Sequence, residues 1–431
     1  MYLRGSKWSM NKRRKPWNWF RITLLGVLVA SAVYVNQVVV PTVDPIGIPT
    51  STPTRPPESF IADAEEFFKQ GKLNQAIEAY TQVVRSKPKD SASYVAMARV
   101  QVWAGKYVDA QTSAENAILI NPNNSNAHAV RGWALEFQRD FTAATISIKK
   151  ALEIDPNNAL AHAYYAELLM DQYAENTGPL DALQKASEES KRALELDPSL
   201  LEAHRARGYV YYMTGGDNMQ LAIDEYQQAI AINKNLAELQ LSLGLSYRAA
   251  ELNDEAIEAF TQANTLNPSD PLPNLYISRI QASLGNYARA LQYAESAVNA
   301  DPSNSNYHGN LGVMLYRNFK YPEAIDEFGY VVRGGTLEDG TKVEGMELTS
   351  SSPRAAEYYF IYGMSLVKSE PPRCGEALQV AQQLLDKLRD NPDYVFNANE
   401  IIRICTTEAT PVAGGAETPS VDQTPTVSPT P

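Results

Sequence analysis

The chain lacks the residues and motifs on which most enzymes and metalloproteins depend. Its 431 residues include only two cysteines and four histidines. The signatures of zinc proteases, P-loop proteins, serine hydrolases and dinucleotide-binding enzymes are all missing. Carboxylates are abundant, but no pair of them is marked out for catalysis. We therefore expect a protein that is not an enzyme and that uses no cofactor and no metal.

Positive charge is scarce outside the N-terminus. The formal net charge is −12, and residues 1–21 carry seven basic side chains and no acidic one, which leaves −19 for the rest. Duplex binding requires clustered cations against phosphate, so we do not expect a nucleic-acid partner. The acidity favours solubility and suits a neutral or cationic partner.

Only one long apolar run is present, at residues 22–40, directly after the basic segment. Nineteen residues at about 1.5 Å each span about 30 Å, the thickness of a hydrocarbon core. Trp17 and Trp19 lie where an interfacial aromatic belt belongs. We expect an uncleaved signal anchor, with the N-terminus cytoplasmic and the rest of the chain extracytoplasmic. The alternative is a signal peptide cleaved near Ala32, after the small-residue motif Ala30-Ser31-Ala32, which would release a secreted protein.

A period of 34 residues dominates the rest of the chain. Prolines 88, 122 and 156 are spaced by it, as are Pro268 and Pro302. Small residues repeat in register where two helices would have to approach closely. One such series is Ala76, Ala110, Ala144, Ala256, Ala290 and Ala324. This period is typical of stacked helix–turn–helix units.

The pattern of Gly, aromatic, Ala and Pro landmarks resembles the tetratricopeptide repeat family over roughly residues 57–392. The resemblance implies an all-α, right-handed α-solenoid of about nine units after one transmembrane helix. The units begin near Pro57, Ser91, Ser125, Ala159, Leu201, Ala237, Pro271, Ser305 and Ala356. Insertions occur near Asp171–Asp181, near Gly215–Met219 and at residues 334–352. The last contains Asp339-Gly340, which predicts either a β-hairpin or a flexible polar loop.

The expected domains are therefore a basic cytoplasmic segment at 1–21, the anchor at 22–40 and a Pro/Thr-rich linker at 41–57. The solenoid with a terminal capping helix follows at 58–406, with the inserted loop or hairpin at 334–352. A Thr/Pro-rich tail at 407–431 is expected to be disordered.

The resemblance also implies where a partner binds. In this family the first helices of successive units line a concave groove. The residues predicted to face it are Arg99, Trp133, Arg205, Tyr209, Tyr212, Arg248, Arg279 and Tyr316. Such aromatic and arginine side chains most often anchor interfaces, although some of the rings are equally suited to packing between units.

The histidines and cysteines receive structural interpretations. His128, His162, His204 and His308 occupy equivalent places in their units, too far apart to share one zinc ion, so we expect them to pack. Cys374 opens one predicted helix and Cys405 closes the next. An antiparallel pair brings these ends together, which predicts a disulfide; two separate buried thiols are the alternative.

The predicted function is a membrane-tethered scaffold that binds a peptide segment or a partner protein in the groove. The alternative is an accessory or regulatory subunit of a cell-envelope enzyme complex.

Overall fold

The computed structural model describes residues 18–39 and 55–408. The expected linker and tail therefore lie almost entirely outside the described residues. The chain divides into two units, residues 1–56 and 57–431, and each is described here by itself.

The first unit contains one apolar helix. Helix α1 (Trp19–Tyr34) continues into a π-helical turn, Val35–Val39. The stretch Trp19–Val38 is long and apolar enough to cross a membrane. Length and composition alone fit a signal sequence equally well.

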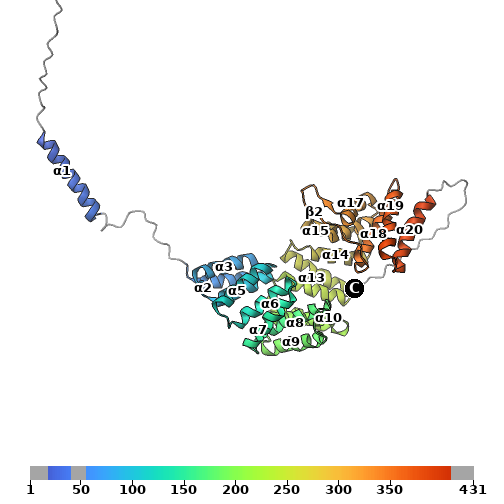
Figure 1. Ribbon diagram of the computed structural model, residues 1–431, viewed down its shortest axis with the longest axis horizontal. Helices are drawn as coiled ribbons and strands as arrows, with labels where there is room; N and C mark the ends of the chain where they lie inside the picture. Colours follow the sequence, from blue (N-terminus) through green and yellow to red (C-terminus); the bar gives the residue numbers. More distant parts are fainter. Residues whose placement is uncertain (1–17, 40–54, 409–431) are drawn as a thin grey trace, which may run out of the picture. The chain divides into compact units, whose positions relative to one another are not determined.

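The second unit is an α-solenoid of nine helix pairs and a terminal helix within residues 57–408 (Figure 1). The first five pairs are α2 (Pro57–Lys69) with α3 (Leu73–Ser86), α4 (Ser91–Trp103) with α5 (Tyr107–Ile120), α6 (Ser125–Phe137) with α7 (Phe141–Ile154), α8 (Ala159–Ala174) with α9 (Ala182–Leu196), and α10 (Leu201–Thr214) with α11 (Met219–Ile232). The last four are α12 (Ala237–Ala249) with α13 (Asn253–Leu266), α14 (Leu272–Ser283) with α15 (Tyr287–Ala300), α16 (Ser305–Arg317) with α17 (Tyr321–Arg333), and α18 (Pro353–Lys368) with α19 (Cys374–Leu388), followed by α20 (Pro392–Glu408).

Local chemistry explains where these helices begin and turn. Asn124 and Asn158 cap the first helices α6 and α8 by accepting hydrogen bonds from backbone N–H groups of the first turn. Gly71 and Gly105 take positive φ angles of 72° and 71° in the turns between paired helices, a conformation that costs glycine little. Arg139 occupies the same place in the third unit at φ 66° without this advantage.

The small residues of the repeat let paired helices approach closely. The alanines of the series that begins at Ala76 are fully buried. A Cβ atom added to Gly132 would lie 2.4 Å from Ile148, and one added to Gly312 would lie 2.9 Å from Phe328. In these two units a small residue of the first helix therefore fits against a large one of the second.

The insertion at 334–352 is ordered against the array. Strands β1 (Gly335–Thr336) and β2 (Lys342–Val343) pair antiparallel around Asp339-Gly340. The side chains of Val343 and Leu348 are buried. Of the two alternatives for this segment, the structure has the hairpin. Because it packs on the array, the hairpin does not stand as an isolated pair of strands.

Candidate partner-binding surface

The first helices of successive units lie side by side, and their shared face is called here the inner wall. In the first half of the array, from α4 to α10, this wall is filled by its own side chains. Arg205 on α10 lies at the centre of these packed side chains. Its guanidinium donates to Glu167 on α8 and, at 2.7 Å, to Glu238 on α12.

Aromatic rings enclose this arginine. Its guanidinium carbon lies 4.8 Å from the ring centroid of Trp133 and 5.1 Å from that of Trp103. Trp133 stacks on Tyr164 with the centroids 4.4 Å apart. Cation–π contacts of this kind strengthen when water is excluded, and Trp133 is 0% exposed.

A second ion pair crosses the filled region. Arg99 on α4 donates two hydrogen bonds to the carboxylate of Glu202 on α10, with Nε–Oε1 and Nη2–Oε2 distances of 2.5 and 2.8 Å. Glu202 is fully buried, and the indole N–H of Trp103 lies 3.4 Å from the same carboxylate. Planar bidentate pairs are among the strongest hydrogen-bonded contacts in proteins.

The ends of this half also meet. Asn233 and Asn235, in the turn before α12, donate to the carbonyls of Phe68 and Lys69 at 3.1 and 2.7 Å, across more than 160 residues of sequence. A Cβ atom on Gly71 would lie 2.2 Å from the Asn235 carbonyl oxygen. We call this contact the closure. It joins the turn after α2 in the first unit to the turn before α12 in the sixth.

Three carboxyl groups next to Arg205 have displaced protonation equilibria. Burial raises the pKa of Glu167 to about 8, although Arg205 acts against that rise. Burial and the charges of Glu167 and Asp171 raise the pKa of Glu136 well above its ordinary value. Burial also raises the pKa of Asp171, which accepts a 2.5 Å hydrogen bond from the Tyr209 hydroxyl. These groups belong to a packed interior in which protonation relieves like-charge repulsion.

This geometry corrects part of the predicted site. Trp133 and Arg205 are buried, so they do not face an open groove. Arg99 and Tyr209 are engaged with Glu202 and Asp171, respectively. The physical reason is the curvature of the first half, which lets Arg99 of α4 reach Glu202 of α10, so that inner side chains pair with one another, while a cavity lined by Arg99, Leu160 and Leu200 remains beside them.

The second half of the wall, on α12, α14, α16 and α18, is different. Arg248, Arg279 and Tyr316 are partly exposed there, and Tyr212 on α10 is partly exposed beside the apolar cluster of Ile223 and Leu243. The Nε atoms of Arg248 and Arg279 have no hydrogen-bond partner within the described residues. Both atoms are buried, as is the Nε of Arg205, which also lacks a partner, so this feature does not distinguish the two halves.

The histidines form a repeated clasp. In each case ring Nε2 lies about 3 Å from the carbonyl of the proline six residues earlier. Nδ1 of His308 lies 2.6 Å from Glu327, and that of His204 lies 2.7 Å from Glu225. His162 contacts Glu189 in the same way. Each ring therefore ties a first helix to the preceding turn, and no group able to hold a metal is found among the described residues.

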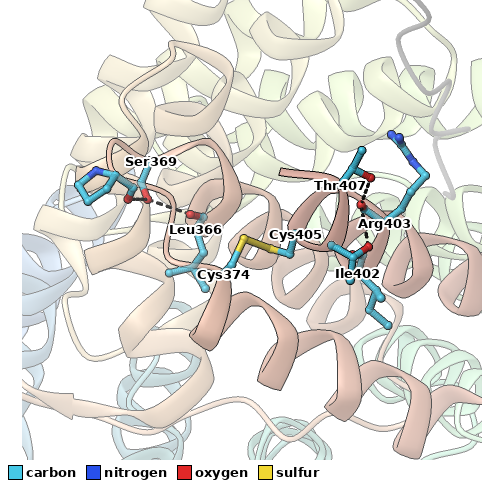
Figure 2. Close-up of a disulfide and its surroundings, with 9 residues drawn as sticks. Leu366, Ser369, Cys374, Ile402, Arg403, Cys405 and Thr407 are labelled. Atoms are coloured by element: carbon cyan, nitrogen blue, oxygen red, sulfur yellow. Dashed lines mark hydrogen bonds between the residues drawn. A yellow bond between two sulfur atoms is a disulfide. The ribbon is translucent and has the colours of Figure 1, made fainter. Parts of the chain in front are cut away.

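The two cysteines lie at the end of the array. Cys374 opens α19 and Cys405 lies near the end of α20, and a disulfide joins them with their Cα atoms 5.4 Å apart (Figure 2). Ala398 and Ile401 of α20 are buried against the preceding pair. The bond therefore fastens α20, the last helix within the described residues, to the start of α19.

Sequence reasoning missed the closure and the filled wall. Arg99 and Glu202 are 103 positions apart, and Lys69 and Asn235 are 166 positions apart, beyond any local pattern. One signal was present: Glu136, Glu167 and Glu202 stand at inner positions of first helices. Carboxylates there require either a cationic ligand or internal arginines, and Arg99 and Arg205 are the internal partners of two of them.

Comparison with known proteins matches the repeats. A family model described as tetratricopeptide repeat matches residues 67–134 and 247–311, and a second of that description matches residues 125–158. Tetratricopeptide repeat protein 8 of Caenorhabditis elegans is 27% identical over 136 residues, 31% of this chain and 26% of that protein. Cell division cycle protein 27 homolog A of Arabidopsis thaliana is 29% identical over 98 residues, 23% of this chain and 14% of that protein.

Among solved structures, the human IFIT1 dimer with PPP-AAAA aligns with a TM-score of 0.52 at 14% identity, over 82% of this chain and 83% of that one. This likeness concerns the fold alone. The matches span about a quarter or less of the two curated relatives' own lengths.

Proposed function

Since the chain belongs to the tetratricopeptide repeat family, we propose that it is a non-catalytic scaffold that holds a partner protein on the second half of its inner wall. The observation that carries this proposal is the contrast between the two halves. In the first half, Arg99 and Arg205 are paired with carboxylates, whereas Arg248, which lies over the half-exposed Tyr276, and Arg279 form no salt bridge within the described residues. Arginine and tyrosine are the side chains that most often dominate binding energy at interfaces.

We further propose that the scaffold is tethered to a membrane by α1. The apolar stretch Trp19–Val38 and the seven basic residues before Ile22 support an anchor with a cytoplasmic N-terminus. The array then stands on the opposite side of the membrane. Alkaline extraction of membranes tests this: a tethered chain stays with the lipid, whereas a chain cleaved near Ala32 appears in the soluble fraction.

Capture of the partner tests the scaffold proposal. Tyr316→Ala with Lys368→Ala removes a ring and a cation that meet on the wall, with Nζ 5.4 Å from the ring centroid. Phe319→Ala with Lys320→Ala is the matched control, because both residues are exposed in the turn after α16, with Phe319 78% exposed. In cross-linked, quantified pull-downs from intact cells, the wall variant should lose a specific partner about tenfold. Equal recovery by the two variants would argue against a partner on this wall.

A further inference from the structure

Charge is divided between the two rows of helices in the second half of the array. The first helices α14 and α16 contain no acidic residue. The acidic residues of α12 and α18 are Glu238 and Glu357, and each already forms a salt bridge with an arginine at 2.7 Å. The second helices carry the acids instead, including Asp254, Glu255 and Glu258 on α13 and Glu323, Asp326 and Glu327 on α17.

Three cations on this wall have no carboxylate. Arg248, Arg279 and Lys368 form no salt bridge within the part of the chain that the structure describes. The contrast with the first half is direct, because Arg99 and Arg205 are both paired there. In a protein with a net charge of −12, an unneutralised cationic wall is not accounted for by solubility.

The rings of the wall hold two of these cations in place. The guanidinium carbon of Arg248 lies 5.1 Å from the ring centroid of Tyr276 on the next first helix. Lys368 lies over Tyr316 in the same way. Arg279 lies near the buried Tyr358. Its positive charge acts against the rise that burial causes in the pKa of the Tyr358 hydroxyl. Holding a cation in place before binding reduces the ordering cost of the complex.

The wall also offers apolar contact between its charges. Leu241 and Leu245 share one face of α12 with Arg248, at intervals of four and three residues, and both leucines are half-buried. Met364 lies one turn before Lys368 on α18 and is also half-buried. Cations that alternate with apolar side chains along successive helices suit an extended segment in which carboxylates alternate with aliphatic residues.

We propose that the inner wall of α12, α14, α16 and α18 binds an acidic, partly aliphatic peptide segment of a partner protein through Arg248, Arg279 and Lys368. This inference rests on the proposed scaffold function and specifies its ligand. It reverses the expectation, drawn from the net charge, of a cationic or neutral partner, because the charge at the wall is opposite to that of the whole chain.

Peptide binding to the full chain in detergent micelles tests the inference. The probe is a fluorescein-labelled peptide of alternating Glu and Leu, compared with the same peptide carrying Gln or Lys in place of Glu. The wall variant Arg248→Gln/Arg279→Gln/Lys368→Gln should weaken binding of the Glu peptide at least about tenfold. The control variant Arg289→Gln/Lys320→Gln/Lys387→Gln removes the same charge from exposed positions outside the wall. It should change the affinity for the Glu peptide by about twofold or less.

Charge reversal separates recognition from simple loss of folding. The variant Arg248→Glu/Arg279→Glu/Lys368→Glu should prefer the Lys peptide to the Glu peptide. High salt should weaken the binding of the Glu peptide to the native array and of the Lys peptide to this variant. If a triple variant does not fold, the exposed Lys368→Gln alone should still weaken binding of the Glu peptide measurably.

Equal affinity for the wall and control variants, or for the Glu and Gln peptides, would overturn the inference. The scaffold proposal fails differently, through equal partner recovery by the Tyr316/Lys368 and Phe319/Lys320 variants. A partner that is captured on the wall through a segment without acidic residues would therefore contradict only the inference.

Discussion

At the scale of single residues, Arg205 carries the most weight in the first half of the array. It neutralises Glu167 and Glu238 and lies against two tryptophan rings. A buried ion pair need not stabilise more than an apolar group of the same shape, but removing one partner leaves a buried charge without compensation. The side chain is thus a requirement for this particular packing.

Arg205→Ala should therefore lower the free energy of unfolding by about 3–5 kcal/mol, measured by urea denaturation. Arg192→Ala is the control, because Arg192 is exposed and its contacts with Asn157 and Glu195 lie at the surface, so a change below about 0.5 kcal/mol is expected. Adding Glu167→Gln to Arg205→Ala should restore part of the loss. Similar values for the two arginine variants would show that Arg205 is not buried as described.

The histidine clasps give the stability a defined pH dependence. Burial lowers the pKa of His308, but the hydrogen bonds to Glu327 and to the Pro302 carbonyl outweigh it, so the pKa is raised. A raised pKa in the folded state adds stability that is complete below the unfolded value of about 6.5 and is lost as pH rises through the folded value. Glu167, with its pKa raised to about 8, acts in the same direction.

We therefore expect the free energy of unfolding to fall between pH 6 and pH 8. His308→Gln should reduce this fall, since the glutamine cannot acquire the charge that Glu327 stabilises. His128→Gln serves as the control, because the only hydrogen bond of that ring within the described residues is to the Pro122 carbonyl. Denaturation midpoints that rise with pH would contradict this assignment.

At the scale of the helix pair, the sequence predicted more than it did at the site. The 34-residue period, the helix-ending prolines and the recurring small residues are local signals, and the structure has nine helix pairs beginning within a few residues of the expected positions. Their success has a physical reason: each unit contacts mainly its neighbours, so local pattern determines local packing. The small rotation between successive units cannot be predicted from the sequence of any one unit. This rotation accumulates along the array, so the sequence did not predict that Arg99 would contact Glu202.

The terminal helix depends on a covalent contact. Removing the disulfide with Cys405→Ser should lower the free energy of unfolding of this end by about 3–4 kcal/mol, from the loop-closure entropy of a 31-residue separation. Alkylation of the native protein without reductant checks the bond itself, because a disulfide leaves neither thiol reactive. Modification of both cysteines under these conditions would contradict it. Hydrogen exchange should increase mainly in α20, because the preceding pairs have their own packing.

At the scale of the whole array, the closure divides the inner wall into a filled half and an available half. Two glycines provide a matched test of it. Gly71 and Gly105 have nearly identical positive φ angles, but a Cβ atom meets the Asn235 carbonyl at 2.2 Å in the first and nothing within 4 Å in the second.

Both Gly71→Ala and Gly105→Ala should lose about 1 kcal/mol from the backbone conformation alone. Gly71→Ala should lose about 1–2 kcal/mol more and increase hydrogen exchange in the turns around Phe68 and Asn235, because the closure must open. Equal losses without a local change in exchange would mean that the first and sixth units do not meet.

The central claim is that partners bind the second half of the wall because the first half is filled. Tyr212 and Tyr316 test it most directly, since they occupy the same position in the fifth and eighth units and both are half-exposed. A photo-reactive phenylalanine analogue placed at each in turn should cross-link a discrete partner in intact cells from position 316 and none from position 212. Cross-linking from position 212 alone, or equally from both, would contradict the claim.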